Sequence, residues 1–253
     1  ETGRELWTYD PKIDLSVRYS ENLVSRVVAA WTSPDSLERE STCGRRILFG
    51  SLDARLLALD AKTGASCSDF GPGGQVDLTP GVEGGNGIEP GQYEVTSPPA
   101  VVGDVVVVGS GIGDNRRADQ ERGIVRGYDV RSGALRWTWD PIPRSPEEEG
   151  WESWTDVAGE EGGEDGRGAE AARTVGSANT WAPISVDPER DLVFLPTGSA
   201  SPDFYGGERP GSNLFANSVV ALRGETGDKV WHYQIVRHDL WDYDVSSQPT
   251  LAD

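Results

Sequence analysis

The densest set of chemically useful side chains is the stretch His238-Asp239-Leu240-Trp241-Asp242-Tyr243-Asp244. Three carboxylates are interleaved with aromatic residues over seven positions, which is unlike a solvated face. A carboxylate that loses part of its hydration has a raised pKa and makes a good general base. An acidic turn would also be inexpensive on so acidic a chain, so both interpretations stay open at this point.

Two further stretches carry residue types that bind metals or cofactors. Gly111-Ile112-Gly113-Asp114-Asn115-Arg116 is a Gly-rich loop that leaves a candidate strand, and its carboxylate and amide oxygens suit a hard cation. An Asx turn, in which Asp and Asn bond their own backbone, explains the same residues. Asn179-Thr180-Trp181-Ala182-Pro183 offers an indole face that can stack on a planar cofactor, although most such tryptophans lie in a core.

The composition excludes some partners. The 253 residues include 42 acidic and 23 basic side chains, for a formal net charge of -19. So negative a chain has nothing to neutralise a run of phosphates, which argues against a nucleic-acid partner. No run of about 18 apolar residues occurs, so we expect membrane contact only through segments outside this chain.

The elements that must position these side chains show a repeat. In three copies a Thr-Gly or Ser-Gly turn is followed by Trp four residues after the Gly: Gly3 with Trp7, Gly133 with Trp137, and Gly227 with Trp231. A fourth copy, 60–64, has Ser68 and Phe70 near the place of the Trp. Self-similarity of this kind indicates a propeller or another repeat array.

Apolar runs precede three of the turns, at 56–59, 124–128 and 219–222, and further strand candidates lie at 47–50, 105–109 and 192–196. Strand, Gly turn and strand predict hairpins, and no long amphipathic helix is evident. We therefore predict an all-β fold, a β-propeller with Trp-docking repeats. Residues 1–253 would form a partial propeller of about three to four blades, because the chain starts within one repeat and stops where a new strand is due.

One segment does not follow the repeat. Residues 145–176 are rich in Glu, Gly and Asp with few apolar residues, so we expect an acidic inserted loop exposed to solvent. A calcium loop is less favoured, because its alternating Asp and Asn ligands are missing.

The two cysteines, Cys43 and Cys67, flank two candidate strands that fold together near Asp53. This places both at the same open end of a hairpin, where a disulfide would imply an oxidising compartment. Two reduced cysteines fit the spacing nearly as well.

Several motifs together resemble the pyrroloquinoline-quinone (PQQ) dehydrogenases, within them the membrane-bound glucose and quinate dehydrogenase branch. They are Cys43-Gly44-Arg45-Arg46-Ile47, the segment 53–60, Thr96-Ser97-Pro98-Pro99, Arg126-Gly127-Tyr128-Asp129, Trp181-Ala182-Pro183 and the segment 238–242. The resemblance implies an eight-bladed quinoprotein propeller that holds PQQ and a divalent metal, Ca²⁺ or Mg²⁺, near its axis.

The same resemblance assigns roles to single residues. Asp242 would be the general base, and Trp181 the ring that stacks on the cofactor. Arg26 would pair with a cofactor carboxylate. Asp114 and Asn115 would lie at the metal, with Asn115 also at the cofactor edge.

Ser201 would contribute a hydroxyl near the cofactor. Asn22 departs from the branch, which usually has His four residues ahead of Arg26. The family's cofactor-binding Lys and later site residues would fall beyond Asp253, so we expect no turnover from this chain alone.

The implied function is oxidation of a sugar or polyol hydroxyl, with electrons passed to the respiratory quinone pool, on the periplasmic side of the bacterial inner membrane. A non-catalytic propeller scaffold for protein binding is the alternative from another class, and a PQQ alcohol dehydrogenase is the alternative within the family. A scaffold has no reason to gather Trp181, Asp114 and Asp242 in one place.

Overall fold

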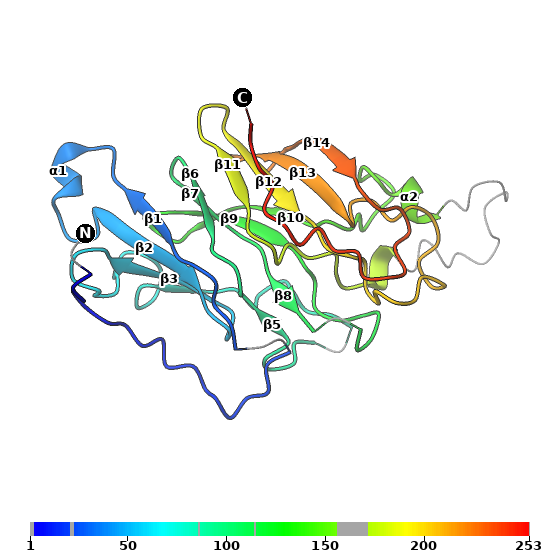
Figure 1. Ribbon diagram of the computed structural model, residues 1–253, viewed down its shortest axis with the longest axis horizontal. Helices are drawn as coiled ribbons and strands as arrows, with labels where there is room; N and C mark the ends of the chain where they lie inside the picture. Colours follow the sequence, from blue (N-terminus) through cyan, green and yellow to red (C-terminus); the bar gives the residue numbers. More distant parts are fainter. Residues whose placement is uncertain (1–2, 21–22, 86, 114, 156–171, 253) are drawn as a thin grey trace.

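The computed structural model describes residues 3–20, 23–85, 87–113, 115–155 and 172–252, which form three four-stranded antiparallel sheets (Figure 1). The first sheet contains β1 (Ala29–Thr32), β2 (Arg45–Gly50), β3 (Arg55–Asp60) and β4 (Gln75–Asp77) in that order. The second contains β6 (Ala100–Val102), β7 (Val105–Val108), β9 (Val125–Asp129) and β10 (Leu135–Trp139). The third contains β11 (Ser185–Asp187), β12 (Leu192–Pro196), β13 (Ser218–Arg223) and β14 (Lys229–Gln234).

Each sheet is an antiparallel meander, as expected of a propeller blade. Strand β6, the first strand and one edge of the second sheet, contacts β1 of the first sheet and β11 of the third. The sheets therefore adjoin along their first strands (Figure 1). A short ribbon of β5 (Tyr93–Glu94) and β8 (Gly111–Ile112) lies beside them. The predicted all-β propeller fold is confirmed, although the three sheets do not close into a ring.

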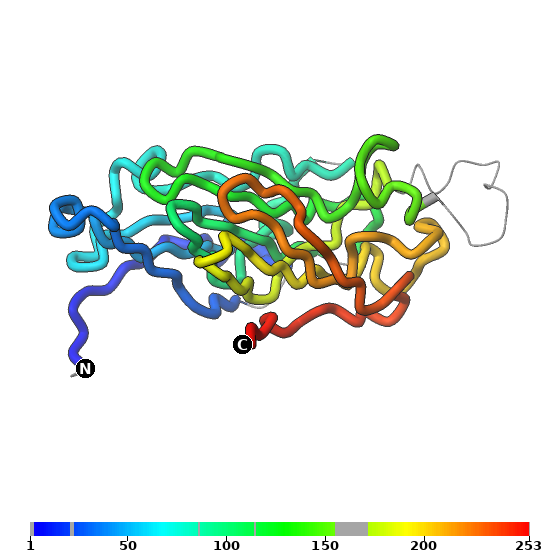
Figure 2. The backbone as a smooth tube through the Cα atoms, turned by 90° about the horizontal axis from the view of Figure 1, so that it is seen from above, coloured from blue at the N-terminus to red at the C-terminus, as the bar shows by residue number. Residues whose placement is uncertain are grey.

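The helices α1 (Ser36–Arg39) and α2 (Glu152–Thr155) are single turns, and residues 172–174 are also helical. Neither is long or apolar enough to cross a membrane, and the same holds for every helix in the part of the chain that the structure describes. In Figure 2 both ends of the chain emerge on the same side of the sheets.

Strand β7 shows how the blades share their core. Successive side chains of a strand point to opposite faces, and the four valines of β7 are all buried because both of its faces are covered. Val106 and Val108 pack with Leu48, Leu56 and other residues of the first sheet, whereas Val105 and Val107 pack with residues of the third. Burial of both faces therefore explains why the sequence at 105–109 is apolar throughout and lacks the alternation of a half-buried strand.

The repeated tryptophans join one blade to the turn of the next. The Trp137 Nε1 of β10 donates a hydrogen bond to the Gly224 carbonyl at 2.8 Å, and a Cβ added at Gly227 would lie 2.7 Å from the indole. Trp7 makes the equivalent contact with the turn of the first sheet, two blades earlier, with its Nε1 3.2 Å from the Ala61 carbonyl and its ring against Gly64. The indole therefore requires a Gly in the turn that it covers.

The fourth copy of the repeat differs from the prediction. Ser68 and Phe70 do not replace the docking Trp; instead Val76 of β4 lies against Gly133, and the Gly71 amide donates to the Ser132 carbonyl at 3.0 Å. Phe70 is fully buried in the core between the first two sheets. The additional residues 65–74 between the turn at 60–64 and β4, called the excursion below, shift the residue that contacts the next turn to Val76.

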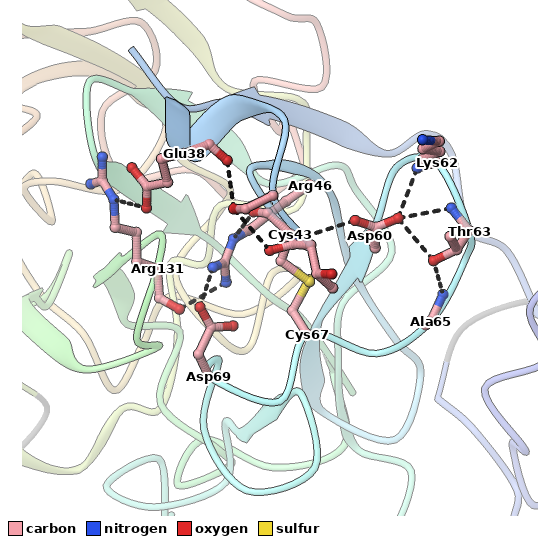
Figure 3. The surroundings of a disulfide bond; sticks show 12 residues. Glu38, Cys43, Arg46, Asp60, Lys62, Thr63, Ala65, Cys67, Asp69 and Arg131 are labelled. Carbon is pink, nitrogen blue, oxygen red and sulfur yellow. Dashed lines mark hydrogen bonds and ion pairs between the residues drawn. A yellow bond between two sulfur atoms is a disulfide. The ribbon is translucent and has the colours of Figure 1, made fainter. Parts of the chain in front are cut away.

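A disulfide between Cys43 and Cys67, whose Cα atoms lie 5.8 Å apart, fixes this excursion to the start of β2 (Figure 3). Beside it, Arg46 donates to the Cys43 carbonyl and to the Arg131 carbonyl of the second sheet, and pairs with Asp69. The disulfide end of the hairpin is therefore also a contact between two blades.

The acidic segment 145–176 is not simply a solvated loop. Its described ends bury Trp151 and Trp154 in a small core with Ile142 and Val175. The Arg144 guanidinium, just before the segment, donates to the Ala172 and Gly176 carbonyls, both at 3.1 Å. The two tryptophans bury apolar area that the acidic composition of the segment does not indicate. Residues 156–171 of the segment lie outside the described part of the chain.

Asp129 makes the turn after β9 sensitive to acid. Although partial burial acts to raise the pKa of Asp129, hydrogen bonds from Ser132, Arg136 and the Arg131 amide lower it to about 2. Because the folded pKa lies below the unfolded one, the stabilisation is present above about pH 4 and is lost as the pH falls towards 2.

We expect Asp129→Asn to lower the free energy of unfolding by about 1–2 kcal/mol at pH 7, after allowance for solvent screening, and by much less near pH 2.5. Urea denaturation at the two pH values measures both numbers. An equal loss at both would show that charge plays no part. Asp77→Asn, at the exposed last residue of β4, is the control and should change little at pH 7, because the Asn Oδ1 can still accept the hydrogen bonds of Thr79.

Candidate active site

A cavity of about 330 Å³ lies where loops of all three sheets meet the β5–β8 ribbon. Its wall is built from segments far apart in the sequence: Val24, Arg26, Thr96, Gly111, Ile112, Asn115, Asn179, Trp181, Asp203, Asp242 and Asp244. Four of the predicted site residues, Arg26, Asn115, Trp181 and Asp242, are therefore brought together. Asp114 lies outside the described residues.

Trp181 is held in a fixed orientation within this wall. Its indole Nε1 donates a hydrogen bond to Asp244 Oδ2 at 2.5 Å. The Arg26 guanidinium carbon lies 5.2 Å from the ring centroid, in a cation–π arrangement. The Arg26 amide in turn donates to the Thr96 carbonyl at 3.1 Å. A planar ring and a cation are thus presented side by side.

Asp239 shapes the turn that presents the other acidic residues. Its carboxylate accepts hydrogen bonds from the Trp241 and Tyr243 amides and from Ser199 Oγ, at 3.1, 2.6 and 2.6 Å. Although burial acts to raise the pKa of Asp239, these bonds lower it. Asp239 is therefore a buried structural carboxylate rather than a reactive one.

The same turn places Asp242 at the cavity. Asp242 adopts φ = 59°, a left-handed conformation that Asp and Asn tolerate better than most residues. In the part of the chain that the structure describes, no group donates a hydrogen bond to its carboxylate. Although Asp242 is exposed at the cavity, partial desolvation and then the charges of Asp244 and Asp239 raise its pKa, so this carboxylate is a stronger base than a fully solvated one.

Asp203 and Asn115 form a reciprocal pair across the cavity wall. Asn115 Nδ2 donates to Asp203 Oδ2 at 2.7 Å, and the Asp203 amide donates to Asn115 Oδ1 at 2.8 Å. Burial, followed by the charges of Asp242 and Asp244, raises the pKa of Asp203 to about 7. The wall thus concentrates negative charge that Arg26 alone does not balance.

The oxygen donors of this wall suit a hard divalent cation. In the described residues, the cavity carboxylates do not lie close enough together to form a cluster of metal ligands. The ligand atoms of Cys43, Cys67 and Asp69 do lie within 4.8 Å of one another, but they are away from the cavity and the two sulfurs are joined in the disulfide. The cavity carboxylates are spread around the wall instead. A cation there would offset the repulsion that an anionic, planar ligand on Trp181 would otherwise meet.

Comparison with known proteins agrees with this arrangement. The family model described as "PQQ: Glucose/ethanol/alcohol dehydrogenase, beta-propeller domain" matches residues 1–253. The chain belongs to the PQQ dehydrogenase propeller family. The expected resemblance is therefore confirmed.

Several quinoproteins are similar to this family member along its whole length. It is 39% identical to the quinate/shikimate dehydrogenase (quinone) of Acinetobacter baylyi, 37% to quinoprotein glucose dehydrogenase A of Acinetobacter calcoaceticus and 35% to the quinoprotein glucose dehydrogenase of Escherichia coli. Each match covers 100% of this chain but 30% of the relative. The solved quinohemoprotein alcohol dehydrogenase from Comamonas testosteroni superposes with a TM-score of 0.73 at 28% identity, over 98% of this chain and 33% of that one.

The residues of this propeller fit the cofactor that names the family. PQQ is a flat, anionic quinone, and the cavity supplies a flat indole, one guanidinium and oxygen donors for a cation. Ser201 does not line the cavity. It is fully buried, and Gln120 Nε2 donates to its hydroxyl at 2.5 Å, so its expected contact with the cofactor is not supported.

The sequence interpretation missed Asp203 and gave Asp244 no role. Asp203 follows β12 in the irregular loop 197–217, whose sequence shows no repeating pattern that would mark it as functional. A carboxylate two residues after a predicted cofactor-site serine could have drawn attention to it. Asp244 belongs to the acidic stretch already singled out, but only the structure shows that it anchors Trp181.

Proposed function

We propose that this chain forms part of the cofactor and substrate site of a PQQ-dependent dehydrogenase that oxidises a sugar or polyol hydroxyl. The observation that carries the proposal is a single cavity that combines the Trp181 ring, the Arg26 guanidinium and the free Asp242 carboxylate. The names of the glucose and quinate dehydrogenases that it resembles support the substrate class.

Each side chain has a distinct task in this proposal. Bound PQQ would supply the two-electron acceptor for hydride. Trp181 would support its ring plane, and Arg26 would pair with one of its carboxylates, a contact that suits the planar guanidinium. Asp242 would take the proton of the substrate hydroxyl. Asn115, together with Asp114, would hold a Ca²⁺ or Mg²⁺ ion.

The proposal concerns the whole gene product. The chain spans about 30% of the length of the curated relatives it matches, so activity, substrate and electron acceptor belong to the longer protein. We propose that this protein works on the periplasmic side of the bacterial inner membrane and passes electrons to respiratory quinone. The Cys43–Cys67 disulfide supports an oxidising compartment.

A binding scaffold explains the site less well. Carboxylates crowded around a cavity repel one another at a cost in folding free energy that a bound cation would offset, and a scaffold does not need them there. A PQQ alcohol dehydrogenase shares the same cavity residues and differs in the loops that select the substrate.

The test is metal-dependent cofactor binding. Titration of the gene product with PQQ in the presence of Ca²⁺ should quench tryptophan fluorescence saturably. Trp181→Ala should weaken binding about tenfold or more, because it removes a stacking partner of about 1–3 kcal/mol. Chelation of the metal should have a similar effect, since the carboxylates would then repel the anionic cofactor.

Trp241→Ala is the matched control. Trp241 lies in the same acidic stretch but is 75% exposed and does not line the cavity. Its loss should leave the dissociation constant within about twofold. Equal binding by wild type and Trp181→Ala would contradict the proposed cofactor site.

A further inference from the structure

A fully buried arginine lies behind the acidic wall of the cavity. Arg209 belongs to the loop 206–213 and has an exposed fraction of 0%. Its Nη1 donates to Asn213 Oδ1 at 2.8 Å, while its Nη2 is shared between two backbone carbonyls. In the described part of the chain, its Nε has no hydrogen-bond partner. A buried cation with incomplete bonding is costly, so its position requires an explanation.

The two carbonyls belong to the two loops that supply the cavity carboxylates. Arg209 Nη2 lies 3.2 Å from the carbonyl of Pro202, which directly precedes Asp203. It lies 2.5 Å from the carbonyl of Asp239, the residue whose carboxylate builds the turn carrying Asp242. One guanidinium therefore fixes both backbone segments relative to each other.

Electrostatics favour the same position. The charges of Asp203 and Asp239 attract the guanidinium, which partly offsets the cost of burying it. An apolar side chain would fill this space at lower cost if packing were the only requirement. Lysine would keep the charge but could not reach two carbonyls with a planar, rigid group.

We propose that Arg209 is a positioning residue of the active site, which sets the distance between Asp203 and Asp242 by binding the backbone of both loops. This inference rests on the proposed function. Arg209 would thus affect the chemical step although it does not line the cavity, and its replacement should leave the cofactor bound.

The experiment compares Arg209→Lys with a matched buried arginine. Arg126 is also buried, at 5% exposure, and donates to the Leu78 and Pro80 carbonyls at 2.8 Å each, but it lies outside the cavity wall. Both Arg→Lys variants of the gene product should lose stability to a similar degree. Only Arg209→Lys should lower kcat, by about tenfold to a hundredfold, as expected for a misplaced group.

Two readouts separate positioning from a general structural role. The dissociation constant for PQQ and the KM for substrate should change less than kcat, because Trp181 and Arg26 lie on other segments and only the Asp244 anchor of Trp181 lies on this turn. In the cofactor-free protein, amide hydrogen exchange of residues 239–244 should rise in Arg209→Lys and not in Arg126→Lys. Equal kcat values, or unchanged exchange in both variants, would overturn the inference.

If Arg209→Lys does not fold, Asn213→Gly carries the test. Asn213 has φ = 59°, which glycine adopts readily, and the change removes the amide that holds Arg209 Nη1. It should lower kcat severalfold with the fold intact; an unchanged kcat would overturn the inference. A wild-type gene product that binds no PQQ and oxidises no sugar or polyol would instead overturn the proposed function, and the inference with it.

Discussion

Replacing Asp242 by Asn should lower the kcat of the gene product about a hundredfold to ten-thousandfold while PQQ binding persists. A single positioned base contributes a factor of this size, and Asn cannot accept the hydroxyl proton. The change is nearly isosteric, and Asn tolerates the left-handed backbone that Asp242 adopts at φ = 59°. The effect should therefore lie in the chemical step rather than in folding.

The surroundings of Asp242 make this the largest catalytic effect that we expect. Its carboxylate lies at the cavity, and partial desolvation together with the charges of Asp244 and Asp239 raises its pKa. Asp239 carries the same charge but is committed to the amides of Trp241 and Tyr243. Asp244 is committed to Trp181 and to the Ser199 amide. Asp242 is the carboxylate of this turn that is free to take a proton.

Steady-state kinetics with a sugar or polyol substrate, at saturating PQQ and Ca²⁺, measures the loss. Asp77→Asn changes an exposed carboxylate at the end of β4, away from the cavity, and should keep the wild-type kcat. A kcat for Asp242→Asn within threefold of wild type would remove Asp242 as the base, even if the cofactor still binds.

The sequence predicted the parts of this site that local motifs encode. Trp181, Asn115 and Asp242 each lie in a short, unusual stretch, so their residue types and the family resemblance together led to one cavity. The repeat likewise led to the propeller, since a Gly turn and a Trp at fixed spacing express a local packing requirement.

What the sequence could not predict depends on contacts between distant loops. Asp203 and Arg209 lie in an irregular loop, and their meaning arises only where that loop meets the turn after β14. The docking role of Val76 was missed because an excursion shifts the register, and the burial of Trp151 and Trp154 was masked by their acidic neighbours. Ser201 was placed by resemblance alone, and its hydroxyl is already engaged by Gln120.

Trp137→Ala should lower the free energy of unfolding of this chain by about 3–5 kcal/mol, the usual cost of removing a buried Trp. Trp137 is 7% exposed and packs between the second and third sheets, with its Nε1 bound to the Gly224 carbonyl at 2.8 Å. The loss combines a cavity with an unpaired carbonyl, and both fall at the contact between two blades.

Trp231 supplies the matched control, because it holds the same position in its repeat on β14 but is 42% exposed in this chain. Trp231→Ala should cost about 1 kcal/mol or less, since the area it buries is smaller. Urea denaturation of both variants, followed by circular dichroism, measures the difference. Equal losses would mean that the repeated Trp stabilises its own hairpin. A large loss for Trp137 alone would mean that the motif stabilises the blade only through the turn of its neighbour, so that each blade of this propeller depends on the next.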